Sequence, residues 1–470
     1  MRTFNYNRYS FLPLALFCLA CNTRIGAQQT LLLSEAIRSG VGHYQTIEAK
    51  RNFIRSSEAL VRNTKNEYLP NIVASLQQDY GTVNGQFGPF SGYGAAGVAS
   101  AGPVYNGQVW NAGFGAAYIL NTNWEVFSFG RLHSKIMLSQ AQVKKDSADY
   151  VQEQFIYSVK VSGAYLSLLV ARKLVENFNA NLSRAIALQK VVLARTQSGL
   201  NAGVDSSIAN SEVSAARLAL INAADNELQV RNQLAQLLNT DPSASFSLDS
   251  NYFKTIPVEF STPADVSQNP QVKYYQALVD QSNQASSYIK KSILPGLNLF
   301  GIFQSRGSGF GYDYNPADRN SYSKSYTDGI NPVRHNYATG LSLAWNILSI
   351  KKIREQANAQ HYLTEAYKNQ YDLIHTQLKD QLVLADQRIA NALLSYREVP
   401  IQYKAATDAY GQKSVLYKNG LTNIVDLQQA LYALNKAETD LGLAYIQVWQ
   451  SLLLKAAASG DLDLFLRQVH

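Results

Sequence analysis

The residues that could bind a metal ion or transfer a proton are scattered along this sequence. Its six histidines form no HExxH pattern and no other compact ligand set. The string from Gly92 to Gly97 fits a dinucleotide-binding fingerprint, but it lies in a Gly-rich stretch that no helical pattern follows. Neither a P-loop nor a GxSxG motif occurs. We therefore predict a protein that is not an enzyme and uses no cofactor or metal, so that any energy for its work comes from partners.

Two aspartates occupy matching places in two short motifs. Asp205 follows the pair Gly199-Leu200, and Asp426 follows Gly420-Leu421 at the same spacing. A glycine that ends one helix in the left-handed conformation, with a carboxylate in the first turn of the next helix, is typical of a tight helical hairpin. The carboxylate gains about 0.3–1 kcal/mol from the helix dipole, so this structural role needs no further function.

Apolar residues cluster at the same two turns. Leu200 and Val204 belong to the first turn, and Leu421, Ile424 and Val425 belong to the second. We expect these side chains to be exposed at the hairpin tips, since no core of the same chain reaches them. Exposed apolar tips usually mark a binding surface for a partner. The alternative is that each leucine packs back on its own helix and staples the turn shut.

The two motifs belong to an internal duplication. A shift of 221 residues superimposes Trp124 on Trp345 and Gly199-Leu200 on Gly420-Leu421. Each half then reads as helix, strand, Gly-rich loop, strand, very long helix, tight turn and helix. The first repeat, 28–240, is predicted to hold strands at about 70–84 and 109–124, a long helix at about 131–197 and a return helix at 205–239. The second, 271–458, is predicted to hold strands at about 296–306 and 336–347, a long helix at about 351–418 and a return helix at 423–455, with an irregular connection at 241–270 and a tail at 459–470.

The helical segments are long and nearly free of breakers. The 67 residues from Arg131 to Gln197 would form a rod of about 100 Å at ~1.5 Å per residue. Pro400 should kink the second long helix. Apolar residues recur at alternating steps of four and three in both return helices, which favours close coiled-coil packing. The recurring residues are Ala209, Val213, Ala216, Leu220, Ala223, Val230, Leu234 and Leu237, then Ala430, Leu434, Ala437, Leu441, Ala444 and Val448.

The strand segments alternate between an apolar face and a face of small polar residues. Such alternation is required of a wall between lipid and water, although a soluble sandwich would show it equally well. We predict that aromatic residues at the strand ends, Trp110, Trp124, Tyr337 and Trp345, lie at the membrane interfaces. Four strands cannot close a membrane barrel, which needs ~8 or more, so several copies must contribute to one wall. The segments 85–108 and 307–334 would be loops at the outer surface.

The first residues indicate export. Arg2 and Arg8 precede an apolar stretch that ends in small residues, which is typical of a signal peptide spanning residues 1–27. Both cysteines, Cys18 and Cys21, lie inside it, so the mature chain would contain none. Acylation of Cys21 as a lipoprotein is the alternative. The formal charge of +8 is spread without long basic runs, so nucleic-acid binding has no support.

The duplicated motifs resemble those of the TolC outer-membrane efflux family. The resemblance rests on Gly420-Leu-Thr-Asn-Ile-Val-Asp426-Leu-Gln-Gln-Ala430, its partner from Gly199 to Ala209, and the Leu-Pro pairs that open each strand pair, and it covers residues 30–458. It implies a homotrimer in the cell outer membrane, with a twelve-stranded β-barrel of four strands per chain continued by an α-helical periplasmic barrel. It also implies an exit duct for efflux or type I secretion that works with a periplasmic membrane-fusion adaptor and an inner-membrane pump.

The resemblance also implies a gate role for Asp426. In the family, three copies of the matching aspartate form an acidic ring at the periplasmic mouth, with a second aspartate three residues later. This chain has Gln429 at that second place, and Thr422 replaces a basic residue that some members use in gate-closing contacts. Two other functions stay open: a passive porin or adhesin, which would not need ~100 Å helices, and a periplasmic coiled-coil scaffold, which would not need lipid-facing strands.

Overall fold

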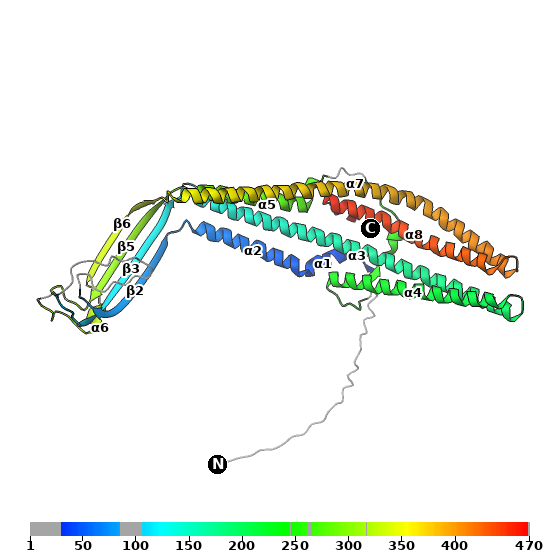
Figure 1. The fold of residues 1–470 in the computed structure, drawn as a ribbon, viewed down its shortest axis with the longest axis horizontal. Coiled ribbons are helices and arrows are strands. Elements are labelled where there is room, and N and C mark those ends of the chain that lie inside the picture. The colour runs from blue at the N-terminus through cyan, green and yellow to red at the C-terminus, as the bar shows by residue number, and fades with distance from the viewer. Residues whose placement is uncertain are drawn as a thin grey trace, which may run out of the picture.

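The protein is an elongated rod of helices with a small sheet at one end (Figure 1). The structure is a computed structural model that describes residues 30–84, 106–244, 246–258, 260, 265–315 and 317–468. The predicted signal peptide with both cysteines, the Gly92–Gly97 string and most of the first predicted outer loop lie outside the described residues.

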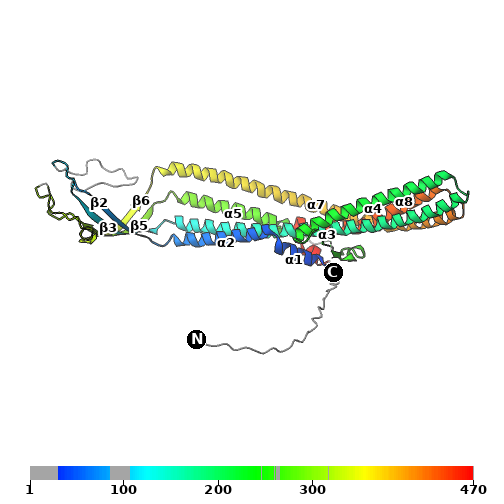
Figure 2. The ribbon, with the colours of Figure 1, turned by 90° about the horizontal axis from the view of Figure 1, so that it is seen from below.

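Four long helices make two hairpins. The first hairpin joins α3 (Arg131–Gln197) to α4 (Gly203–Leu238), and the second joins α7 (Ser349–Lys418) to α8 (Ile424–Ser459). The hairpins lie side by side and end together at the end of the molecule far from the sheet (Figures 1 and 2). Three helices run beside α3 and α7 nearer the sheet: α1 (Leu33–His43), α2 (Gln45–Asn66) and α5 (Pro270–Lys291).

Proline and glycine set the helix ends. Residue Pro270 begins α5 at a position where its missing N–H is not needed, and Gly460 ends α8 with a φ of +80°. Pro400 lies inside α7, which continues through it and curves toward the tips (Figure 1). Of the described helices, α3 alone is long and apolar enough by composition to cross a bilayer, and half of that window is buried inside the protein.

The sheet contains four antiparallel strands in the order β2-β3-β5-β6. It is formed by β2 (Asn71–Thr82), β3 (Ala112–Phe127), β5 (Gly296–Ser308) and β6 (Arg334–Ala344). Strands β2 and β6 are its edges, and neither pairs with a further strand of the described chain. A separate parallel pair joins β1 (Thr30–Leu31) to β4 (Ser247–Leu248).

The strand register separates an apolar face from a polar face. Residues paired across strands lie on one face, and one row contains Ala74, Leu120, Phe303 and Tyr337. The opposite face carries the row Gln77, Ala117, Arg306 and Arg334. The alternation expected from the sequence therefore places most of the large apolar residues of the four strands on one side of the sheet, while Phe300 and Ile302 lie on the other.

The second predicted strand and the second predicted outer loop differ from the structure. β3 begins at Ala112 instead of residue 109, so Trp110 precedes the strand, and β3 continues to Phe127 beyond the predicted end at 124. The predicted loop 307–334 contains a short helix, α6 (Tyr326–Ile330), that folds back on the sheet. The Tyr118 hydroxyl donates to the carbonyl of Ile330 over 3.1 Å, so α6 covers the apolar face beside Tyr118.

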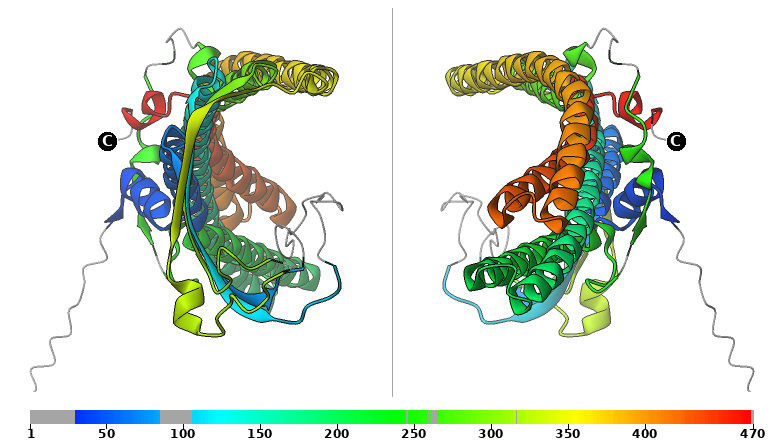
Figure 3. Two further views of the ribbon diagram at one scale, coloured as in Figure 1. Left: turned by 90° about the vertical axis from the view of Figure 1, so that its left-hand side faces the viewer. Right: turned by 90° about the vertical axis from the view of Figure 1, so that its right-hand side faces the viewer.

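The main core lies where the hairpins meet the shorter helices. Tyr165, Leu166 and Leu234 are fully buried there, together with Trp449 and Phe465. Phe465 belongs to α9 (Asp463–Leu466), so this part of the predicted tail 459–470 packs into the core. The connection between the halves adds two short 3-10 helices, Ser250–Phe253 and Val266–Gln268. The α1 helix and the C-terminal end lie on the outer side of the curved helical layer (Figure 3).

The coiled-coil seams agree in part with the predicted positions. In α4 the buried positions include Ala209, Val213, Ala216 and Ala223. In α8 the seam runs through Leu427 and Leu431, while the predicted Ala430 is half-buried. Further along α8 the predicted Leu434, Ala437, Ala444 and Val448 are buried, and Leu441 is half-buried.

Candidate functional site at the hairpin tips

Both hairpins turn by the same local hydrogen-bond pattern. Gly199 and Gly420 have φ angles of +72° and +75°, which lie in the left-handed region that glycine adopts without strain. The N–H of Leu200 donates to the carbonyl of Arg195 over 2.9 Å, and the N–H of Leu421 donates to that of Leu416 over 2.9 Å. In each turn the glycine N–H also donates to the carbonyl three residues earlier. This pair of hydrogen bonds is the Schellman motif that ends helices.

Four of the five predicted apolar tip residues are exposed. The exposed fraction is 69% for Leu200, 61% for Val204, 72% for Leu421 and 50% for Val425. The prediction for Ile424 is wrong, because this residue is only 3% exposed. Ile424 is the first residue of α8, and its side chain turns inward between the two hairpins.

Ile424 belongs to a small core that joins the hairpins near their tips. Leu188 and Val192 of α3 and Ala209 of α4 contribute from the first hairpin, and Tyr417 and Leu427 contribute from the second. The tips are therefore packed together within one chain, while the exposed leucines remain outside this contact. Sequence spacing alone did not separate Ile424 from Val425, which is its direct neighbour.

The Asp426 carboxylate lies in the first turn of α8, as predicted, and has partners in its own hairpin. Lys413 Nζ lies 2.8 Å from Asp426 Oδ2, and the Thr422 hydroxyl donates to the same oxygen over 3.0 Å. The side chain of Asn423 caps the helix by accepting the Asp426 N–H over 2.8 Å. The hydrogen bonds from Lys413 and Thr422 lower the pKa of Asp426 from its ordinary value.

Asp205 also lies in the first turn of its helix, α4, as predicted. Its carboxylate accepts a hydrogen bond of 2.8 Å from the Asn201 amide. The same amide donates to the Tyr417 hydroxyl over 3.0 Å, which connects this turn to the second hairpin. Asp205 therefore takes part in the contact between hairpins through Asn201.

Arg195 is the main polar link between the tips, and sequence analysis missed it. Its Nη1 donates to the carbonyls of Tyr417 and Lys418 over 3.1 and 3.0 Å, and its Nε donates to Asn201 over 2.9 Å. A guanidinium at the last carbonyls of α7 also favours that helix's dipole. The 221-residue shift pairs Arg195 with Leu416, so the duplication gave no signal for this residue.

An ion pair joins the two hairpins about halfway between the tips and the core. Arg184 of α3 binds Glu438 of α8 with both terminal guanidinium nitrogens, Nη1 and Nη2, and the distance from Nη1 to Oε1 is 2.9 Å. Both side chains are about four-fifths buried, since their exposed fractions are 21% and 17%. Such a bidentate geometry fixes the relative position of the two helices.

The predicted interface aromatics occupy two ends of the sheet. Trp124 and Trp345 lie at the end joined to the helices, where each indole N–H donates to a backbone carbonyl: that of Tyr68 over 2.7 Å and that of Ile293 over 2.9 Å. These carbonyls directly precede the two Leu-Pro pairs, so both halves of the chain use the same contact. Tyr337 is exposed on the apolar face, and Trp110 is exposed before β3.

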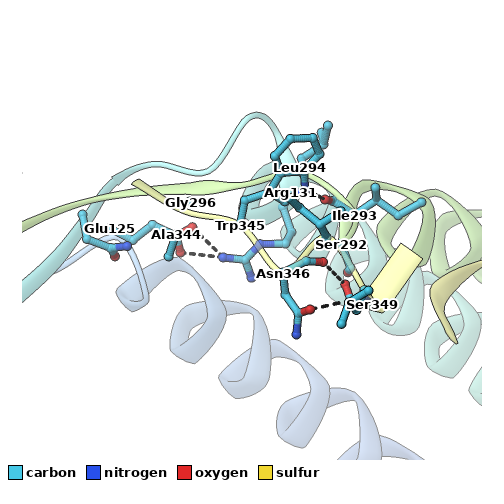
Figure 4. A pocket seen from close by; sticks show the side chains of 13 residues that line it. Glu125, Arg131, Ser292, Ile293, Leu294, Gly296, Ala344, Trp345, Asn346 and Ser349 are labelled. Atoms are coloured by element: carbon cyan, nitrogen blue, oxygen red, sulfur yellow. Dashed lines mark hydrogen bonds and ion pairs between the residues drawn. The ribbon is translucent and has the colours of Figure 1, made fainter. Parts of the chain in front are cut away.

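A pocket of about 820 Å³ opens beside Trp345 (Figure 4). It is lined by the turn between α5 and β5, by the turn between β6 and α7, and by the ion pair between Arg131 and Glu125. The Glu125 carboxylate raises the pKa of the Arg131 guanidinium despite the cost of burial. The pocket lies at the joint between sheet and helices. Within the described part of the chain, no three His, Cys, Asp or Glu residues are grouped as a metal site would require.

The fold and the tips define an elongated protein class in which long helical hairpins extend from a small antiparallel sheet. Residues 45–240 match the family model of outer membrane efflux proteins, which confirms the TolC family resemblance. Comparison with curated protein sequences finds no match.

Solved structures of three outer-membrane proteins share the fold. The channel OprN is 16% identical, with 91% of this chain and 89% of that chain covered and a TM-score of 0.73. VceC from Vibrio cholerae is 14% identical, with coverage of 91% and 96% and a TM-score of 0.72. The open-state channel MtrE from Neisseria gonorrhoeae is 17% identical, with coverage of 91% and 89% and a TM-score of 0.70.

Proposed function

We propose that this chain is one third of an exit duct in the cell outer membrane, which passively conducts substrates from a periplasmic adaptor and an inner-membrane pump to the exterior. The observation that carries the proposal is the sheet with two free edges and an exposed apolar face, placed at one end of helices about 100 Å long. A wall facing lipid needs the sheet, and a passage across the periplasm needs the helices.

The height of the apolar face fits a bilayer. Tyr337 and Trp345 are eight residues apart, which is about 27 Å along a strand and about 21 Å along the membrane normal at a tilt of ~40°. The apolar band of outer-membrane barrels is ~25 Å tall. Trp124 and Trp345 then lie at the lower boundary of the band, where amphipathic indoles are favoured.

The free edges support a homotrimer. An unpaired strand edge in lipid leaves backbone N–H and C=O groups without partners, which costs several kcal/mol per group. Pairing β6 of one copy with β2 of the next removes both edges, and three copies give twelve strands. The concave curvature of the helical layer favours closure around an axis (Figure 3).

The purified mature protein should therefore be a trimer that resists dissociation in warm detergent. Its mass in detergent can be measured by light scattering, and its circular dichroism should show mixed helix and strand. A monomer that keeps the native dichroism in detergent would contradict the proposal.

The functional test is efflux in cells that lack their own channel. Expression of the chain should restore drug efflux only when a matching adaptor and pump are also present. Membrane fractionation should place the protein in the outer membrane, whereas a periplasmic scaffold would be released with the soluble fraction. A passive porin would raise permeability without adaptor or pump.

We propose further that Asp426 lines the periplasmic mouth of the duct. Three copies would bring three carboxylates to one axis, where they concentrate cations. Lys413 and Thr422 hold the carboxylate in place, and Lys413 offsets part of its charge. The Asp426→Asn variant should therefore lower cation selectivity in planar-bilayer recordings.

The pH dependence of this selectivity follows from the lowered pKa of Asp426. Because its pKa is lowered from the ordinary value of 3.8, the Asp426 carboxylate stays charged at any pH above 3.8 and loses its charge only at lower pH. Cation selectivity should then persist at pH 5, while the Lys413→Met variant should lose it at a higher pH than the wild type. Unchanged selectivity in Asp426→Asn would leave only the helix-start role.

A further inference from the structure

We infer that Arg306 and Arg334 form an anion-binding site inside the barrel, near its outer mouth, for solutes that carry carboxylate or phosphate groups. The two arginines are direct cross-strand partners at the end of β5 and the start of β6. Both side chains are exposed. The inference rests on the proposed duct, because it assigns the polar face of the sheet to the lumen.

The position of α6 identifies which face of the sheet is external. This helix lies against the face of Tyr118 and Phe114, and the ring of Tyr326 packs edge-on to Phe114 at 5.2 Å. Gly307 shares that face, since an added Cβ there would lie 2.6 Å from the carbonyl of Gly329. Successive residues of a strand point to opposite sides, so Arg306 points away from α6.

The arginine pair has no carboxylate partner that would explain it as a structural ion pair. Among the described residues neither guanidinium forms an ion pair, and the one side-chain hydrogen bond is from Arg334 Nη1 to the carbonyl of Val333 over 2.9 Å. Like charges directly opposite each other destabilise a sheet. The presence of both arginines on one exposed row is explained if they bind anions that enter the lumen.

A carboxylate on the same face belongs to Asp79, in the next row toward the outer end. The Asp79 carboxylate leans over Gly115, since a Cβ added to Gly115 would lie 2.6 Å from Asp79 Oδ1. It hydrogen-bonds to the Gln77 amide at 3.4 Å. Each chain therefore brings two cations and one anion to this level, and a trimer would have six arginines against three aspartates.

A ring of guanidinium groups suits planar or tetrahedral oxyanions. Arginine presents several N–H donors in a fixed plane that match carboxylate and phosphate oxygens two at a time. Rings of Arg or Lys also set anion preference in pores. The outer mouth would then favour anionic cargo, while Asp426 at the other end favours cations.

The test is the ion selectivity of the trimer in planar bilayers, with tripolyphosphate as the blocking probe. The Arg306→Gln variant should lower the chloride-to-potassium permeability ratio about twofold or more. It should also weaken tripolyphosphate block about tenfold, as expected for loss of charge-assisted hydrogen bonds. The Arg306→Lys variant should keep most of the permeability ratio but not the block.

A cysteine variant separates charge from packing. Both native cysteines lie within residues 1–27, so Arg306→Cys would provide a single reactive thiol in a chain cleaved after residue 27. A cationic thiol reagent should restore anion preference, and an anionic reagent should lower it further. The charge-matched control is Arg467→Gln, an exposed arginine directly after α9, which lies on the outer side of the helical layer (Figure 3). This variant should change neither quantity.

Two results would overturn the inference. One is a conducting trimer whose selectivity and block are unchanged in Arg306→Gln. The other is equal loss of trimer stability in Arg334→Gln and Asp79→Asn with normal selectivity in Arg306→Gln, which would make Arg334 an ion-pair partner of Asp79 in the next copy. A wild-type trimer that conducts no ions would refute the proposed duct itself, so the two failures are distinguishable.

Discussion

Replacing Leu200 and Leu421 together with serine should abolish efflux while leaving a normal trimer in the outer membrane. Both side chains are more than two-thirds exposed, at the end of a rod where none of the described residues covers them. Exposed apolar groups of this kind bind partners, and the adaptor of a tripartite system is the partner we propose. Serine at exposed positions should change the free energy of unfolding by less than about 0.5 kcal/mol.

The rival explanation is that each leucine staples its own turn. In the Schellman motif a staple would join Leu421 to Leu416, yet both remain exposed, at 72% and 37%. Stapling predicts a lower melting temperature of the double variant, with surviving trimers still coupled to the pump. Crosslinking to the adaptor, efflux of a dye and thermal unfolding of the trimer separate the two accounts.

Ile424 offers the matched control for the tip variants. It lies four residues from the Gly420 turn but is buried between the hairpins. Ile424→Ser should lower the stability of the tip region by about 2–5 kcal/mol, because it opens a cavity and buries a hydroxyl group. Ile424→Ser should therefore speed proteolysis at the tips, whereas the leucine variants should leave the stability of the tips unchanged.

Replacing Trp449 with alanine should have the largest effect on stability of any single change considered for this chain. Its ring is 2% exposed and packs edge-on to Tyr252 at 5.0 Å and to Phe465 at 5.8 Å. Its indole N–H donates to the carbonyl of Thr255 over 3.1 Å. Loss of the ring should cost about 3–5 kcal/mol per chain, through the cavity and the unpaired carbonyl.

The Trp449 variant should loosen two segments at once. Tyr252 belongs to the connection between the halves and Phe465 to the C-terminal helix, so both should gain amide hydrogen exchange. The control is Trp110→Ala, whose ring is 81% exposed and which should leave unfolding in detergent unchanged. Equal destabilisation by the two variants would show that the central core does not depend on Trp449.

The long elements could be predicted because their signals are local. Prolines are absent over the 67 residues of α3, and the helix ends at the predicted Gln197, two residues before Gly199. The duplication located α7 and its turn in the same way, and the predicted start of α7 at about residue 351 is two residues from the observed start at Ser349. The apolar face of the sheet followed from alternation, which depends only on the pleat of a strand.

The contacts between hairpins could not be predicted, because their partners are far apart in the sequence. Arg195 meets Tyr417 across 222 residues, and Arg184 meets Glu438 across 254. Ile424 is buried and Val425 exposed because the first hairpin lies on one side of α8, which periodicity near a helix end does not reveal. The fold-back of α6 depends likewise on Phe114 and Tyr118 of a distant strand.

Each hairpin is a lever whose fulcrum is the central core. From the buried Leu166 to the turn at Gly199 the α3 helix measures about 50 Å at ~1.5 Å per residue. A rotation of about 10° at the core would therefore carry the tip through about 9 Å, so small repacking gives a large change in aperture. The same length makes the mouth hard to close tightly, because a rotational freedom of about 1° at the core becomes almost 1 Å at the mouth. A tight closure needs contacts at the tips themselves, where Arg195 and Lys413 lie.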